Sequence, residues 1–122
     1  MKKLIKKFLK RSLEKREFEE QNKKYDINIS ELKELQNEGA IIVDVRSPQE
    51  YKEGHIDGAI SIPEYEIKKT GEKLLKNKDE KIILYCSSGT RSKKAQKILQ
   101  KLGYKSVFNL YEGYNTSNFE LL

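Results

Sequence analysis

The sequence predicts an α/β domain with a central, mainly parallel five-stranded sheet flanked by helices. Short apolar runs typical of strands alternate with segments whose apolar residues recur at helical spacing. The two most apolar runs, residues 40–45 and 82–85, have the composition of strands that are buried on both faces, as in parallel sheets covered by helices. A chain of 122 residues is long enough for one such domain and its core.

The first elements follow from local polarity and capping signals. Residues 25–29 alternate in polarity and predict a short edge strand. Ser30 is the expected N-cap of a helix over residues 31–36, which ends near Gly39. Residues 40–45 then form the second strand.

The middle of the chain combines one clear helix start with a polar stretch. Ser47 followed by Pro48 predicts a short helix that ends by Gly54, and residues 59–62 predict the third strand. Residues 64–78 are polar with few apolar positions, and we expect two short helical pieces broken near Thr70 and Gly71.

The next strand leads directly to the most informative stretch of the sequence. The predicted strand over residues 82–85 is followed by Cys86, the only cysteine of the chain. A turn of small residues comes next. Beyond it, apolar residues recur at steps of three and four and predict a helix with Gly103 at its carboxyl end, before a last strand over residues 106–110. The helical positions are Ala95, Ile98, Leu99 and Leu102.

This order places Cys86 at the carboxyl end of a buried strand and beneath a helix N-terminus. The first amides of a helix have no acceptor within the helix and, with the helix dipole, favour an anion. Beside Arg91, a thiol in such a loop is expected to have a lowered pKa and to be largely thiolate. An inert buried thiol is the commoner fate of a lone cysteine, but the strand, cysteine, turn, arginine and helix order favours a reactive one.

The loop around the cysteine is the expected binding site for an anion. Small side chains let the backbone approach closely, and Gly89 tolerates unusual dihedral angles. We therefore take Cys86 as the nucleophile and the following six residues as the active-site loop: Ser87, Ser88, Gly89, Thr90, Arg91 and Ser92.

Three other polar residues are candidates near this loop. Asp44 and Arg46 lie at the carboxyl end of the strand at residues 40–45, and in a parallel sheet that end faces the same crevice as Cys86. The alternative for this pair is an ordinary surface ion pair of little energetic worth. His55 is the only histidine, and we expect a hydrogen-bonded structural imidazole rather than a general base, because an ionised thiol needs no base.

Two segments resemble the signatures of the rhodanese-like sulfurtransferases. Residues 44–63, DVRSPQEYKEGHIDGAISIP, match D-x-R-x-x-x-E-[FY]-x-x-G-H-I-x-G-A-x-x-[IL]-P, and residues 86–91, CSSGTR, match C-x-x-G-x-R. The resemblance covers about residues 27–114 and implies a three-layer domain in which Asp44 and Arg46 help to hold the loop. Family members often end this region with two glycines and a tryptophan, and this chain departs from that pattern at residues 112–114 and at Ser117.

The resemblance implies a two-step sulfur transfer through Cys86. A sulfane sulfur from thiosulfate or a small persulfide would pass to Cys86 and then to cyanide, a thiol or a protein, with no cofactor and no metal. Because the chain has one cysteine, regeneration must be intermolecular. A phosphatase or arsenate reductase is a weaker alternative, because the phosphatase signature encloses five residues and this loop encloses four. A non-enzymatic sulfur carrier or binding module fits the residues as well as an enzyme does.

The charge of the chain is concentrated in its first 24 residues. They contain ten Lys or Arg against four Glu, while residues 25–122 are balanced. A uniformly basic nucleic-acid-binding domain is therefore not expected. We predict a basic amphipathic segment over residues 1–24, helical or partly disordered, and a rhodanese-like domain over residues 25–122.

The basic segment has an apolar stripe but no long apolar run. The stripe is too interrupted for a membrane span or a secretory signal, and with the single cysteine this predicts a cytoplasmic protein. We favour packing of the stripe on the domain or a partner chain, or partial disorder, over contact with an anionic membrane surface. The stripe consists of Leu4, Ile5, Phe8, Leu9 and Leu13.

Overall fold

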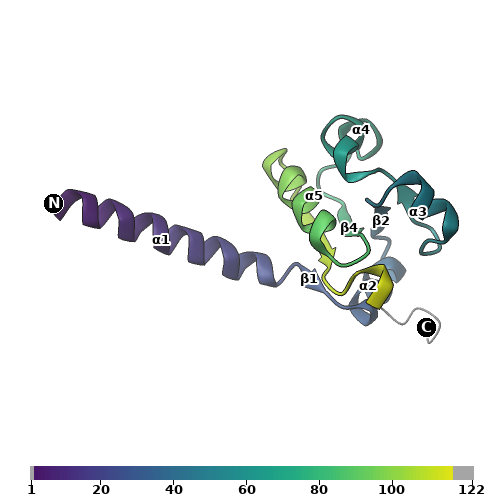
Figure 1. The fold of residues 1–122 in the computed structure, drawn as a ribbon, viewed down its shortest axis with the longest axis horizontal. Helices are drawn as coiled ribbons and strands as arrows, with labels where there is room; N and C mark the ends of the chain where they lie inside the picture. Colours follow the sequence, from purple (N-terminus) through teal and green to yellow (C-terminus); the bar gives the residue numbers. More distant parts are fainter. Residues whose placement is uncertain (1, 117–122) are drawn as a thin grey trace.

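A computed structural model describes residues 2–116, with the side chains of all residues in that range except 2–4, 17–22 and 116. Helices surround a central sheet, and one long helix extends away from it (Figure 1). In chain order the elements are α1 (Lys2–Lys23), β1 (Asp26–Ile27), α2 (Ile29–Asn37), β2 (Ile41–Asp44), α3 (Pro48–Glu53), β3 (Ile60–Ser61), η1 (Glu64–Glu66), α4 (Ile67–Leu74), β4 (Lys81–Tyr85), α5 (Thr90–Lys101), β5 (Ser106–Leu110) and α6 (Gly113–Thr116).

The described strands form one sheet of five, all parallel, in the order β1-β5-β4-β2-β3. The predicted α/β class is confirmed, and the sheet is parallel throughout rather than mainly. In the central pair Asp44 lies beside Tyr85, and the amide of Val45 donates to the carbonyl of Tyr85 at 3.0 Å. The residues that follow β2 and β4 therefore leave the sheet at the same edge, where the carboxyl ends of parallel strands meet.

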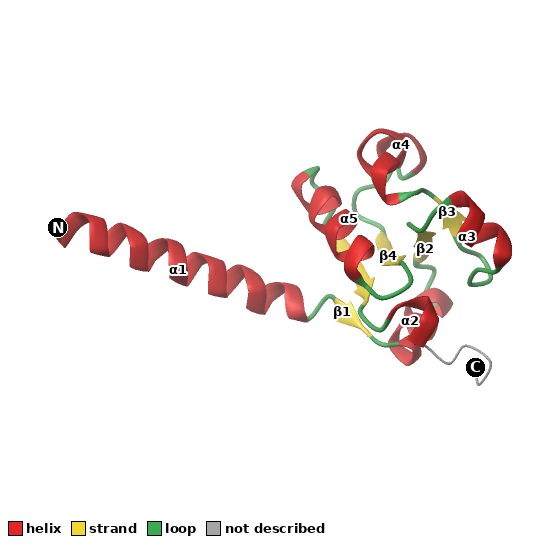
Figure 2. Cartoon of the chain, in the orientation of Figure 1, coloured by secondary structure: helices red, strands yellow, loops and turns green. Residues whose placement is uncertain are grey.

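Helices cover both faces of the sheet (Figure 2). The side chains of β4 contribute to both halves of the core. Side chains of a strand alternate between faces, so Ile82, Leu84 and Cys86 belong to the cluster that includes Leu99 of α5. Ile83 and Tyr85 belong to the other cluster, with Leu32 of α2. Residues 82–85 are fully buried, as expected for a strand with no solvent-facing side.

The start of α2 differs from the prediction. The N-cap is Asn28 rather than Ser30: Asn28 Oδ1 accepts a hydrogen bond from the amide of Glu31 at 2.9 Å, and Glu31 Oε1 accepts one from the amide of Asn28 at 3.3 Å. This reciprocal cap needs an acidic or amide residue three positions after the cap. Ser30 has Lys33 at that position, so the helix begins earlier and β1 is shorter than predicted.

The predicted break at Thr70 and Gly71 is wrong. The chain passes from η1 to α4 between Glu66 and Ile67, and Gly71 lies buried inside α4. A Cβ at Gly71 would lie 3.6 Å from Leu99 Cδ2. This glycine therefore stands where α4 packs against α5, and it does not end a helix.

Helix α1 does not place its apolar stripe on the domain. Figure 1 shows it extending from β1 away from the sheet, and its large apolar side chains are 55–75% exposed: Ile5, Phe8, Leu9 and Leu13. The side chain of Leu4 lies outside the described residues. The expectation of packing on the domain is therefore wrong, and packing on a partner chain stays a prediction. No helix in the described part of the chain has the length and apolar character needed to cross a membrane.

Candidate active site

The cysteine loop connects the end of β4 to the start of α5. Cys86 is the first residue after β4, and Gly89 precedes α5 with φ of +92°, in the left-handed region that favours glycine. A Cβ at Gly89 would collide with the carbonyl oxygen of Tyr111. The expected strand, cysteine, turn and helix order is therefore present, and only glycine fits at the turn.

The thiol of Cys86 is buried, at 1% exposure, but it is surrounded by hydrogen-bond donors. Sγ accepts from the amide of Gly89 at 3.1 Å and from the amide of Ser92 at 3.4 Å, and Ser92 Oγ lies 3.3 Å away. Burial raises the pKa of Cys86, but the hydrogen bonds from Ser92 and from the amides of Ser88 and Gly89 together lower it below its usual value. The surroundings therefore favour a thiolate.

The outer side of the loop is held by the start of α6. The amide of Tyr114 donates to the carbonyl of Cys86 at 2.7 Å, and the amide of Asn115 donates to the carbonyl of Ser87 at 3.1 Å. Gly113 has φ of +76°, and a Cβ there would overlap the carbonyl oxygen of Ser87. These contacts keep the loop carbonyls occupied on the outside while the amides face the sulfur. The sequence signalled this region only as a departure from the double-glycine pattern.

Arg91 is held at the edge of the loop by a carboxylate that the sequence analysis did not single out. Its Nη1 lies 2.7 Å from Glu50 Oε1 and its Nη2 lies 3.0 Å from Glu50 Oε2. Ser87 Oγ donates to Glu50 Oε2 at 2.9 Å and accepts from Arg91 Nη2 at 3.1 Å. Hydrogen bonds from Arg91 lower the pKa of Glu50 far below its usual range. The Arg91 guanidinium, at the start of α5, therefore links the loop to Glu50 of α3, and its hydrogen bonds go to Glu50 and Ser87.

Glu50 had a local signal in the sequence, although its pairing with Arg91 had none. It follows Ser47 by three residues, and the two form the reciprocal cap of α3: the amide of Glu50 donates to Ser47 Oγ at 3.2 Å and that of Ser47 donates to Glu50 Oε1 at 3.1 Å. The same carboxylate therefore starts α3 and fixes Arg91. The predicted start of α3 at Pro48 and its end at Gly54 are confirmed.

Asp44 and Arg46 form a buried pair behind the loop rather than a surface pair. Arg46 Nη2 lies 2.8 Å from Asp44 Oδ2, and the amide and Nε of Arg46 donate to Asp44 Oδ1 at 2.9 and 3.1 Å. Tyr85, the residue before Cys86, donates its hydroxyl to Asp44 Oδ2 at 2.8 Å. The alternative of an exposed ion pair is wrong.

This pair reaches the loop only through intermediates. Arg46 Nη2 donates to the carbonyl of Gly54 at 2.6 Å, and its guanidinium lies 4.3 Å from the ring centroid of Tyr114. Tyr114 is the residue whose amide binds the carbonyl of Cys86. Asp44 and Arg46 therefore support the backbone that surrounds the site, without touching the sulfur.

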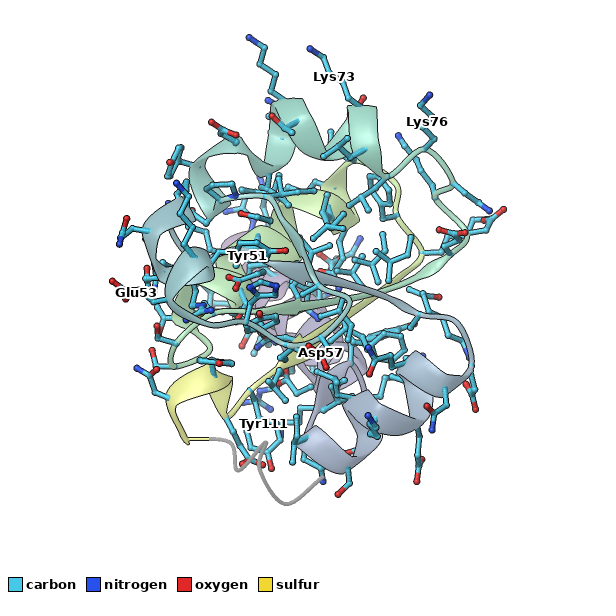
Figure 3. All side chains as sticks on the ribbon, turned by 90° about the vertical axis from the view of Figure 1, so that its right-hand side faces the viewer. Tyr51, Glu53, Asp57, Lys73, Lys76 and Tyr111 are labelled. Atoms are coloured by element: carbon cyan, nitrogen blue, oxygen red, sulfur yellow. The ribbon has the colours of Figure 1, made fainter. Side chains whose placement is uncertain are left out.

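His55 lies on the surface and interacts with Tyr51. Its Nδ1 is 2.8 Å from the carbonyl of Tyr51, so that nitrogen donates, and the two rings stack at 3.7 Å between centroids (Figure 3, where Tyr51 is labelled). Both interactions fit a structural imidazole. The contacts around Cys86 come from other residues.

The chain is similar to known proteins over most of its folded part. The family model for the rhodanese-like domain matches residues 28–117. The thiosulfate sulfurtransferase PspE of Escherichia coli K12 is 37% identical over 67 residues, which are 55% of this chain and 64% of that protein. The putative sulfur carrier protein YrkF of Bacillus subtilis 168 is 38% identical over 77 residues, 63% of this chain and 40% of that protein.

A solved structure of similar size agrees with the fold. The human single-domain sulfurtransferase TSTD1 superposes with a TM-score of 0.68 at 26% identity, covering 75% of this chain and 93% of the human chain. The chain spans less than two thirds of the length of PspE and YrkF.

Proposed function

This chain belongs to the rhodanese-like domain family, and from that premise we propose that it is a sulfurtransferase that works through a persulfide on Cys86. It takes a sulfane sulfur from thiosulfate or a persulfide donor and passes it to a thiophilic acceptor: cyanide, a thiol or a protein. The observation that carries the proposal is the set of amides from Gly89 and Ser92 that donate to Cys86 Sγ within a loop that also lowers its pKa.

The first step is a displacement at sulfur. The Cys86 thiolate attacks the outer sulfur of thiosulfate, a new S–S bond forms, and the bond to the sulfonate sulfur breaks with sulfite leaving with the electron pair. The charge on the product persulfide moves to the outer sulfur. The loop amides that solvate the thiolate are placed to solvate that charge too.

The second step returns the enzyme to its starting state. The acceptor attacks the outer sulfur, the bond to Cys86 Sγ breaks, and Cys86 leaves as thiolate. With cyanide the product is thiocyanate. Residues 87–92 bind the sulfur through their backbone, while Arg91, fixed by Glu50, keeps the loop in shape.

A phosphatase or arsenate reductase has less support. Four residues lie between Cys86 and Arg91, which leaves a narrow ring of amides, whereas a tetrahedral oxyanion needs a wider one. The donors of Arg91 are also engaged with Glu50 and Ser87. Both features suit one additional sulfur atom better than phosphate or arsenate.

A sulfur carrier without turnover uses the same intermediate, and the similarity to the putative sulfur carrier YrkF keeps it as the second candidate. An enzyme and a carrier differ in how the sulfur is released from Cys86. An enzyme regenerates Cys86 many times with a free small acceptor, whereas a carrier holds its sulfur until a partner removes it.

The test follows the intermediate directly by intact mass. After thiosulfate treatment the mass should rise by about one sulfur atom and return on addition of a reductant, as a reversible cysteine modification does. Cys86→Ser should show no gain. A wild-type chain that stays unmodified, or that hydrolyses an aryl phosphate as efficiently as it forms thiocyanate, would refute the proposal; a gain without turnover would identify the carrier.

A further inference from the structure

A groove of about 520 Å³ begins at the reactive loop and follows one side of α5. Loop residues 88–90 form its near end, and Lys93, Lys94 and Lys97 line it along the helix. Asn109 and Tyr111, from β5 and the segment after it, complete the lining. Thiosulfate and cyanide are far smaller than this groove, which has the volume of sites for larger ligands, roughly 300–1,000 Å³.

The cationic side chains of the groove come from α5, which carries no acidic residue. Between Thr90 and Lys101 the helix has five cationic side chains: Arg91, Lys93, Lys94, Lys97 and Lys101. Lys93 pairs with Asp26 at 3.0 Å and Lys94 pairs with Glu64 at 3.1 Å. Lys97 is exposed and has no ion pair within the described part of the chain. Lys97 is therefore the lining cation that is left for an anion in the groove to pair with, and the partly exposed pairs of Lys93 and Lys94 lie beside it.

Asn109 lies in the wall of the groove but is itself covered. It is 3% exposed, and its Oδ1 has no hydrogen-bond partner among the described residues. Because this oxygen is closed off from solvent, a molecule in the groove meets the lysines and Tyr111 rather than Asn109 Oδ1. An inorganic anion is small compared with the groove, whereas an acidic peptide can extend along it and carries carboxylates.

The groove also fits a peptide in length. From Thr90 to Lys97 the helix rises about 10 Å, which about three extended residues cover. Tyr111 places a half-exposed ring on the opposite wall, available to pack against the chain of a bound peptide. We infer that this groove docks an acidic segment, next to the acceptor cysteine, of the protein that receives the sulfur; this inference rests on the proposed sulfur transfer.

The docked segment would bring its thiolate to the loop. That thiolate attacks the outer sulfur of the Cys86 persulfide, the S–S bond to Sγ breaks, and Cys86 leaves as thiolate while the acceptor becomes a persulfide. No oxidant or reductant is needed, because sulfur is exchanged between two thiols. The lysines bind only the acidic residues beside the acceptor cysteine.

The experiment compares acceptors on one preloaded protein. The full chain is loaded with sulfur from thiosulfate, and transfer is timed to a cysteine peptide with three neighbouring Asp or Glu residues and to its Asn and Gln counterpart. We expect the acidic peptide to react about 3- to 10-fold faster, with the advantage lost at high salt, as for charged groups near the surface. Lys97→Glu should abolish or reverse the ratio, and Lys69→Gln on α4 serves as the control that keeps it.

The ratio is measured within each variant, so a general change in Cys86 reactivity cancels. Equal rates for both peptides on wild type, or an unchanged ratio in Lys97→Glu, would overturn the inference. A small dicarboxylate thiol favoured as strongly as the acidic peptide would overturn the assignment to a protein segment. Failure of the initial loading with thiosulfate would instead refute the proposed function, so the two results are separable.

Discussion

The carboxylate of Glu50 holds the guanidinium of Arg91 at two points, with Nη1 to Oε1 at 2.7 Å and Nη2 to Oε2 at 3.0 Å. The two residues come from α3 and α5, so this pair ties two helices across the mouth of the cysteine loop. Arg91 can therefore shape the loop without touching sulfur. This arrangement leads to the first of five predictions.

Glu50→Gln should destabilise the protein modestly and slow the loading of Cys86. The pair is partly exposed, so its contribution is about 1 kcal/mol rather than that of a buried ion pair. Urea unfolding measures the first effect and the rate of mass gain with thiosulfate measures the second. The matched control is Glu38→Gln, which breaks the exposed pair with Lys81; a loading rate as slow in the control as in Glu50→Gln would contradict the bracing role.

Ser92→Ala should raise the pKa of Cys86. The substitution removes the hydroxyl 3.3 Å from Sγ while keeping the amide of residue 92. Because the chain has one cysteine, the ultraviolet absorbance of its thiolate reports a single site. We expect the wild-type midpoint below the ordinary thiol value of about 8.5, and the variant midpoint higher. Ser106→Ala, outside the loop, should leave the midpoint of the Cys86 titration unchanged. A shift in Ser106→Ala as large as that in Ser92→Ala would refute the assignment to Ser92.

Stability should depend on pH through the same thiol. The folded pKa of Cys86 is lowered, so the native state gains stability as pH rises through that folded value, and the gain is complete above the unfolded value of about 8.5. As pH falls through the folded pKa the gain is lost. Urea midpoints measured across this window should rise in wild type and stay flat in Cys86→Ser. Parallel curves for the two proteins would contradict a thiolate in the folded state.

Gly113→Ala should be strongly destabilising because two effects combine. The residue has a positive φ, and its new Cβ would overlap the carbonyl of Ser87. We expect a loss of at least about 2–3 kcal/mol by thermal unfolding. Gly39→Ala isolates the first effect, since Gly39 also has a positive φ but no atom within 4 Å of the added Cβ. The free energy of unfolding should fall by about 1 kcal/mol in Gly39→Ala. Equal losses in the two variants would show that the structure relieves the overlap between residue 113 and Ser87.

Tyr85→Phe should affect stability more than thiol chemistry. The hydroxyl donates to Asp44 Oδ2 at 2.8 Å and accepts from the amide of Ile56 at 3.0 Å. Its removal takes one donor from the buried Asp44 carboxylate, which keeps Arg46, and removes the acceptor of the Ile56 amide. A loss of about 1–3 kcal/mol in urea unfolding is expected. Tyr65→Phe, at an exposed ring, is the control and should be neutral. A large shift of the Cys86 titration in Tyr85→Phe would instead couple Asp44 to the sulfur.

Much of the fold could be predicted because its signals are local. The apolar runs at β2 and β4 and the cap formed by Ser47 and Glu50 act within a few residues. The position of Cys86 after a buried strand follows from the same patterns, since a strand followed closely by a helix leaves only a short loop. The parallel sheet follows because each crossover contains a helix.

The missed features are contacts between distant residues or choices between nearby signals. Glu50 and Arg91 are 41 positions apart, and the residues around one of them do not indicate that it pairs with the other. Gly71 looks like a helix end, but Leu99 of a different helix explains it. Ser30 and Asn28 are both good caps, and only the acid three residues later decides between them.

Cys86 directly follows β4 and continues the row of Ile82 and Leu84, within the same cluster as Ala95 and Leu99. The nucleophile is therefore also a core residue, and the donors around it keep their places only while that layer is tightly packed. Enlarging or trimming a neighbour such as Ala95 would alter the acidity of the sulfur even if the protein stays folded. One titration curve can thus serve as a sensor of how well this half of the domain is packed.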